Sequence, residues 1–146
     1  MRKILFRGKS IGHGKKWIHG YYVKMDVSGE FEEDRIYTGW EDSWEEPDYF
    51  EVDPATIGEY TGICDSNCDK IFEGDIITFP YRNKKERGIV SFVNGRFYVK
   101  NKVELRNAEL HHVALFLEIY VIGNIHDNPE LLKECGYEHS TSGDDI

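Results

Sequence analysis

The dipeptide Asn94-Gly95 is the short feature that most constrains how this chain can fold. It separates two apolar runs, residues 88–93 and residues 96–99. The tightest β-hairpin turn needs a positive φ at both central residues, and asparagine followed by glycine adopts this conformation readily. The sequence therefore predicts an antiparallel hairpin at this position.

Short apolar or aromatic runs, separated by turn residues, extend over most of the chain. Aromatic residues make up 14% of the 146 residues and single glycines interrupt the runs, which is typical of strand-rich domains. The predicted strands are residues 4–6, 17–25, 31–37, 50–57, 59–63, 76–79 and 118–125. We therefore expect a mainly β fold.

Three further segments follow other patterns. Residues 82–87 are charged, and we interpret them as a loop. Residues 105–117 fit helical spacing as well as an extended segment, so both interpretations stay open. Residues 128–136 predict a short helix, because Asn128 can cap it and Pro129 suits its first position.

Charge is distributed unevenly along the chain. The chain has 18 Lys and Arg against 27 Asp and Glu, a formal charge of −9. Residues 30–60 hold twelve acids and one base, whereas residues 82–106 hold eight bases and two acids. Acidic and basic strands that neutralise each other in one sheet explain this pattern, and so does a basic face that binds phosphate. The net negative charge disfavours nucleic acid as a partner.

Several features bear on the compartment. No run approaches the roughly 20 apolar residues of a membrane span, so we expect no membrane partner. The opening residues lack the apolar region of a secretory signal. Three cysteines, an odd number, favour free thiols in a reducing compartment. These features predict a cytoplasmic protein.

Metal and cofactor motifs are incomplete. Cys64 and Cys68 have metal-ligand spacing, but no second ligand pair accompanies them and a tetrahedral zinc site needs four ligands. The glycine-rich residues 8–16 match neither the Walker A pattern nor the dinucleotide-binding pattern. We therefore expect neither a metal nor another cofactor.

Glu73-Gly74-Asp75 is the best candidate for acid–base chemistry, because it places two carboxylates around a glycine. Its position directly before an apolar strand favours a turn in which Asp75 accepts backbone N–H bonds. No serine, threonine or cysteine has a recognisable partner for nucleophilic catalysis. The sequence predicts no catalytic residue, and we expect that the protein is not an enzyme.

Two sets of residues are candidates for binding. Trp40, Trp44 and Tyr49 lie among acidic residues and are the predicted protein-contact site, because aromatic residues concentrate binding energy at interfaces. Small barrels also bind nucleic acid through basic and aromatic residues. The face for this alternative consists of Arg82, Lys84, Lys85, Arg87, Arg96 and Lys100.

Several segments together resemble one family. They are residues 1–8, the pattern Trp17-x-x-Gly20-Tyr21, the stretch over residues 52–77 and the closing stretch over residues 121–132. These segments are similar to the YopX-like proteins of bacteriophages and prophages. Cys68 is a departure, since that family usually has glycine at this position.

The resemblance implies a β-rich fold whose C-terminal part is an SH3-like barrel, encoded by a phage or an integrated element. It implies no catalytic, cofactor-binding or metal-binding residue. We predict an N-terminal β-meander over residues 1–58 packed on an SH3-like barrel with one short C-terminal helix over residues 59–136. Residues 137–146 predict a disordered tail.

The favoured function is a non-enzymatic protein-interaction module in the cytoplasm of a bacterial host, with a host protein as a partner. A nucleic-acid-associated module is the alternative, and an enzyme ranks last. Exposed strand edges also predict a homo-oligomer, because such edges pair readily with copies of themselves.

Overall fold

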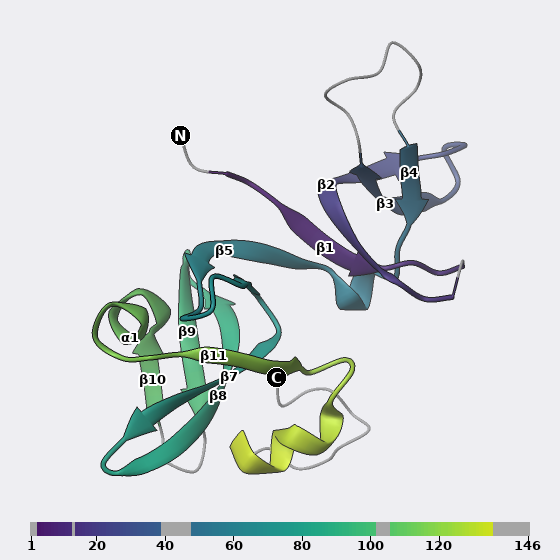
Figure 1. The fold of residues 1–146 in the computed structure, drawn as a ribbon. Helices are drawn as coiled ribbons and strands as arrows, with labels where there is room; N and C mark the ends of the chain where they lie inside the picture. The colour runs from purple at the N-terminus through teal and green to yellow at the C-terminus, as the bar shows by residue number, and fades with distance from the viewer. Residues whose placement is uncertain (1–2, 13, 39–47, 102–105, 136–146) are drawn as a thin grey trace. The chain divides into compact units, whose positions relative to one another are not determined.

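The computed structural model describes residues 3–12, 14–38, 48–101 and 106–135 (Figure 1). Trp40, Trp44 and the predicted tail over residues 137–146 lie outside the described residues. The chain divides into two compact units, Met1–Tyr60 and Thr61–Ile146. We call these the first unit and the second unit.

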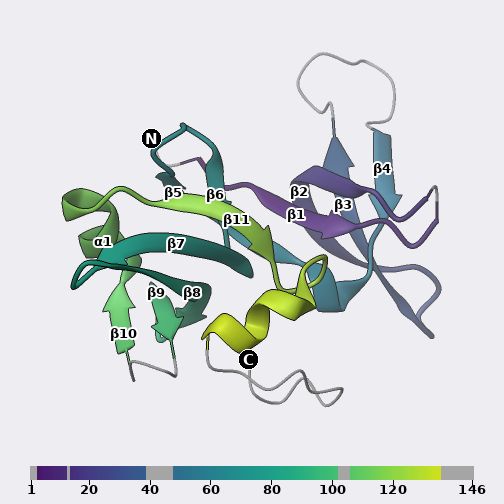
Figure 2. The same cartoon turned by 60° about the horizontal axis from the view of Figure 1, so that its bottom comes forward.

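The fold is mainly β, as the sequence predicts. In the described residues the strands form two antiparallel sheets, with the orders β4-β3-β2-β1-β5-β6 and β10-β9-β8-β7-β11. A single short α-helix and two 3-10 helices complete the described elements (Figures 1 and 2). The SH3-like detail that the resemblance implies stays a prediction.

The first unit consists mainly of strands and buries few apolar side chains among its described residues. Its elements are β1 (Phe6–Lys9), β2 (Trp17–Asp26), β3 (Glu32–Thr38), β4 (Asp48–Glu51), the 3-10 helix η1 (Pro54–Thr56) and the start of β5 (Gly58–Cys64). Ile36 and Val52 are completely buried. Gly20 lets β2 approach β3 closely, since a Cβ at this position would lie 2.1 Å from the carbonyl oxygen of Tyr37.

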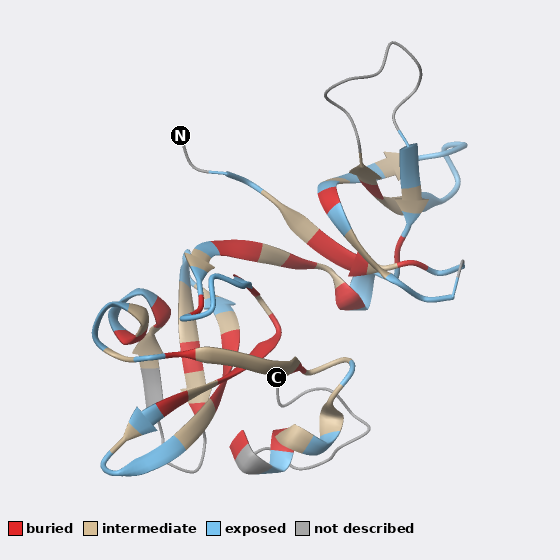
Figure 3. Cartoon of the chain, in the orientation of Figure 1, coloured by how far each residue is buried: buried red, intermediate tan, exposed pale blue. Residues whose placement is uncertain are grey.

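The second unit buries apolar residues on both faces of its sheet. Figure 3 shows buried residues, in red, along its strands and in both of its helices. Its elements are β6 (Lys70–Phe72), β7 (Asp75–Tyr81), β8 (Lys84–Val93), β9 (Arg96–Asn101), β10 (Arg106–Glu109), α1 (Leu110–Phe116), β11 (Tyr120–Asn124) and the 3-10 helix η2 (Pro129–Cys135). We call the face that carries Ile77 and Val90 the inner face, and the face that carries Ile76 and Ile89 the outer face.

Different elements cover these two faces. The inner cluster consists of Ile71, Ile77, Phe79, Val90, Val99, Leu110, Val113 and Ile119. On the outer face, Leu132 and Cys135 of η2 join Ile76 and Ile89. This burial raises the pKa of the Cys135 thiol to about 11.

The sequence predictions for two hairpin turns of the second unit have opposite outcomes. The hairpin at Asn94-Gly95 is confirmed, since both residues have positive φ, 50° and 84°. The interpretation of residues 82–87 as a loop is wrong: Arg82 and Asn83 form a two-residue turn with φ of 49° and 65°, and β8 begins at Lys84. Neither residue of this second turn is glycine, which is why the sequence signal is weak.

The ambiguous residues 105–117 contain both structures, a strand followed by a helix. β10 pairs with β9 up to Glu109, and α1 then buries Leu110 and Val113. The short helix predicted over residues 128–136 forms as η2, a 3-10 helix over Pro129–Cys135.

Candidate interaction surfaces

Three tyrosines form a row across the sheet of the first unit. The register places Tyr21 of β2 opposite Tyr37 of β3, and Tyr37 opposite Tyr49 of β4. Side chains alternate between the faces of a strand, so this row lies on the face opposite the buried Ile36. Tyr21 is 46% exposed and Tyr49 is 45% exposed. We call these three residues the tyrosine row.

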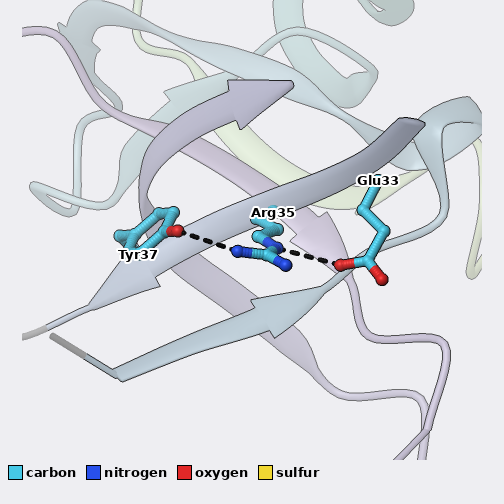
Figure 4. A network of polar contacts seen from close by, with 3 residues as sticks. All are labelled: Glu33, Arg35 and Tyr37. Atoms are coloured by element: carbon cyan, nitrogen blue, oxygen red, sulfur yellow. Dashed lines mark hydrogen bonds and ion pairs between the residues drawn. The ribbon is translucent and has the colours of Figure 1, made fainter. Parts of the chain in front are cut away.

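Arg35 lies beside the row and contacts two of its members, and Figure 4 shows its hydrogen bonds to Tyr37 and Glu33. Its Nη1–H donates to the hydroxyl of Tyr37 at 3.2 Å, and its Nε–H donates to Glu33 at 2.9 Å. Its guanidinium lies over the ring of Tyr49, 4.1 Å from the ring centroid. The hydrogen bonds to Tyr37 and Glu33 raise the pKa of Arg35 above its ordinary value, so the group stays cationic. These contacts restrain the side chains of Tyr37 and Tyr49 before any partner binds.

The surroundings of the row are acidic. Glu51 is the cross-strand neighbour of Arg35, so it lies on the same face as the row, and it is exposed. The single base among the twelve acids of residues 30–60 is Arg35, which already pairs with Glu33 at 2.9 Å. A partner at this face thus meets aromatic rings beside the exposed carboxylate of Glu51.

Sequence analysis found one member of this row. Tyr49 was predicted as a protein-contact residue, whereas Trp40 and Trp44 lie outside the described residues. Tyr21 and Tyr37 were missed, because only the cross-strand register brings them beside Tyr49. The period-two alternation of β2 was the available signal, since it places Tyr21 and Val23 on one face.

The six residues predicted to bind nucleic acid lie on both faces of the second sheet and in a turn. Lys85, Arg87, Arg96 and Lys100 occupy outer-face positions of β8 and β9, whereas Lys84 occupies an inner-face position and Arg82 lies in the turn. Arg96 donates to Glu109, which lowers the pKa of that carboxyl group. These six residues do not form one face.

The buried carboxylates serve the backbone. Asp75 accepts the N–H of Phe72 at 2.8 Å, beside Gly74 with a φ of 93°, which confirms the predicted turn. Asp65 accepts the N–H groups of Asn67 and Asp69 through one oxygen. Its other oxygen accepts the N–H of Val121 at 3.0 Å.

The remaining candidates for chemistry are dispersed. Within the described part of the chain, no group of three or more His, Cys, Asp or Glu side chains is placed to hold a metal ion. Cys64 and Cys68 are both exposed. None of the described helices has the length and apolar character needed to cross a membrane.

A protein-family model and a solved structure are both similar to this chain. The family model described as YopX protein matches residues 6–133. The crystal structure of protein EF1440 from Enterococcus faecalis is similar over 90% of this chain and 99% of that chain, with 24% identity and a TM-score of 0.56, which supports the fold. No curated protein matches the chain. Because the family model covers most of its length, the chain belongs to the YopX family.

Proposed function

We propose that this protein is a non-enzymatic interaction module that binds a basic surface of another protein through the tyrosine row. The observation that carries this proposal is the alignment of Tyr21, Tyr37 and Tyr49 on one sheet face, with Tyr21 and Tyr49 nearly half exposed. Tyrosine supplies a large contact area together with a polar group, and it is enriched among the residues that dominate interface energies.

Arg35 strengthens this argument through its fixed geometry. Its contacts with Tyr37 and Tyr49 restrict the side chains before binding. Association normally costs about 0.5–1.5 kcal/mol for each long side chain that becomes ordered. An ordered row avoids part of that cost, so a modest contact area can give useful affinity.

Charge favours a partner of different composition over a second copy of this chain. Two copies meeting at this face would bring Glu51 of one copy toward Glu51 of the other. Like charges brought together at an interface oppose association, whereas a basic partner gains affinity and association rate. We therefore infer a partner that presents lysine or arginine residues around an apolar centre.

The buried carboxylates support a non-enzymatic role. Asp65 and Asp75 accept backbone N–H bonds, which is a structural use of groups that could otherwise act as acids or bases.

A phage or prophage origin and a bacterial host protein as partner belong to the same proposal, with the bacterial cytoplasm as the place of action. Homo-oligomerisation through strand edges is a separate expectation, and light scattering at micromolar concentration that gives the 17.0 kDa monomer mass contradicts it.

The test of the proposal is capture by the immobilised full-length chain from a lysate of the bacterium that carries its gene. Tyr21→Ala/Tyr49→Ala removes the two exposed ends of the row. Phe31→Ala is the matched control, since Phe31 is a 56% exposed aromatic residue between β2 and β3 and outside the row. We expect the double variant to lose a protein that the native chain and the control retain.

The captured protein is then purified, and its binding is measured by calorimetry at two salt concentrations. We expect the dissociation constant to rise at least tenfold in the double variant, and to rise with salt for the native chain. Capture that survives the double substitution, an acidic captured protein, or no captured protein contradicts the proposal. Loss of a homodimer in the double variant assigns the face to a second copy and also contradicts it.

A further inference from the structure

We propose that the end of the β7–β8 hairpin binds the phosphate backbone of double-stranded DNA. The hairpin ends in the pairs Pro80–Lys85 and Tyr81–Lys84, closed by the turn at Arg82 and Asn83. All four residues from Arg82 to Lys85 are exposed. This site lies in the second unit and is independent of the tyrosine row.

The cations at this hairpin end have no acidic partner among the described residues. Arg82, Lys84 and Lys85 form no ion pair with any residue that the structure describes, whereas Lys24 pairs with Glu32 and Arg96 pairs with Glu109. Arg82 lies over the ring of Tyr81, 5.1 Å from its centroid, which restricts the guanidinium at the tip. Three cations within four residues therefore stay available to an anionic partner.

Two acids among the described residues lie near this hairpin end, and neither forms an ion pair with its cations. Glu86 occupies an inner-face position, where it accepts from the amide of Asn101 at 3.4 Å. Glu118 lines a pocket of about 280 Å³ beside Lys85, Pro80 and Tyr120. Salt limits the effect of more distant acids on this tip, because the Debye length is about 8 Å at physiological salt.

The two faces of the hairpin favour a duplex over a single strand. Lys84 occupies an inner-face position and Lys85 an outer-face position, so their charged groups leave opposite sides of the ribbon, with Arg82 in the turn between them. A two-stranded ribbon fits the major groove of B-DNA, where a row of phosphates borders each side. A single strand offers one row of phosphates, which only one side of the ribbon can follow.

The test measures the fluorescence anisotropy of a labelled 20-base-pair duplex of random sequence with the full-length chain. Three phosphate contacts predict a slope of about −2.7 in a plot of log affinity against log salt, and so about a 40-fold loss between 50 and 200 mM salt. Arg82→Gln/Lys84→Gln/Lys85→Gln should abolish this dependence and reduce affinity at 50 mM at least thirtyfold. Lys15→Gln/Lys16→Gln/Lys24→Gln removes the same charge from the first unit and should preserve affinity within about threefold.

Single substitutions test the geometry. Lys84→Gln and Lys85→Gln should each reduce the slope by about 0.9, because each removes one phosphate contact. Thermal unfolding of every variant confirms that these exposed substitutions leave the fold intact. Undetectable duplex binding at 50 mM salt overturns the proposal, as does equal loss in the control. Tighter binding to a single-stranded oligonucleotide or to duplex RNA also overturns it, as does a slope that depends on only one of the two lysines.

Discussion

The two units of this protein use their apolar residues in opposite ways. Within the described residues, the second unit buries two clusters, one on each face of its sheet. The buried apolar residues of the first unit are Ile36, Val52 and Tyr60, while Tyr21 and Tyr49 stay nearly half exposed on the other face. The second unit thus gains stability from burial, and the first unit keeps an ordered aromatic face available for recognition. The predictions below test this division.

The largest expected effect is the loss of a side chain from the inner cluster of the second unit. Ile77→Ala removes a completely buried side chain. Such truncations cost about 3–5 kcal/mol, because transfer energy is lost and a cavity remains. Chemical denaturation measures this as a fall in the free energy of unfolding. Leu115→Ala, at a 68% exposed position of α1, is the control and should change it by less than about 0.5 kcal/mol.

A small effect of Ile77→Ala would break the comparison. A loss below about 1 kcal/mol would mean that the inner cluster relaxes around the cavity, as a loosely packed core does. The second unit would then depend on strand pairing, as the first unit does.

The first unit is expected to be most sensitive where its strands approach each other. Gly20→Ala places a Cβ 2.1 Å from the carbonyl oxygen of Tyr37, an atom of the backbone that cannot rotate away. We expect a loss of about 3 kcal/mol, because β2 must separate from β3. Gly12→Ala is the matched control, since its Cβ would meet no atom within 4 Å and should cost little.

This substitution also affects the tyrosine row, which depends on the same register. Two-dimensional NMR of the Gly20→Ala variant should show shifts at Tyr21, Tyr37 and Tyr49, whereas the residues of η2 should keep their native shifts. Equal free energies of unfolding for the two glycine variants would show that β2 and β3 are not held as closely as their register indicates.

Asp65 tests how the second unit fixes a surface turn. Its carboxylate accepts two N–H groups of the turn and the N–H of Val121 on β11. Asp65→Asn keeps one acceptor oxygen but replaces the other with an N–H group, which cannot accept. We expect a loss of about 1–3 kcal/mol, the cost of an unsatisfied buried group.

Asp69→Asn provides the comparison for this turn, because the side chain of Asp69 is exposed. It should be nearly neutral in the same denaturation experiment. If the two variants lose the same free energy of unfolding, the turn does not depend on the carboxylate of Asp65. The stability of the second unit would then come from its buried clusters and not from this turn.

The sequence predicted those parts of the fold that local chemistry determines. Asn94-Gly95 defines its hairpin within four residues, and the Glu73-Gly74-Asp75 turn depends on adjacent groups. The turn at Arg82 and Asn83 was missed, because it lacks glycine and because exposed hairpin ends need no apolar alternation. A run of charged residues at this position is also typical of a loop.

The candidate site was only partly predictable for a related reason. Tyr49 was identified from the aromatic and acidic composition around it, which is a local signal. Tyr21 and Tyr37 join it through strand register, which links positions far apart in the chain and depends on which face is buried. Composition alone therefore identifies the segment of the chain that takes part in the proposed binding, whereas the strand register identifies which residues form the binding surface.

The smallest expected effect is a gain of stability at Cys68, in the same turn as Asp65. Cys68 has a φ of 67°, a conformation that costs an L-residue other than glycine roughly 1–2 kcal/mol. Glycine removes this strain but increases the entropy of the unfolded chain, so Cys68→Gly should stabilise the protein by about 0.5–1 kcal/mol.

Cys64→Gly is the matched control for this prediction. Cys64 is also exposed but ends β5, where glycine should lower the free energy of unfolding by a similar amount. Opposite signs for the two substitutions would show that the backbone conformation at residue 68 favours glycine. A loss of stability at both positions would instead mean that the Cys68 side chain stabilises the turn despite its strained backbone.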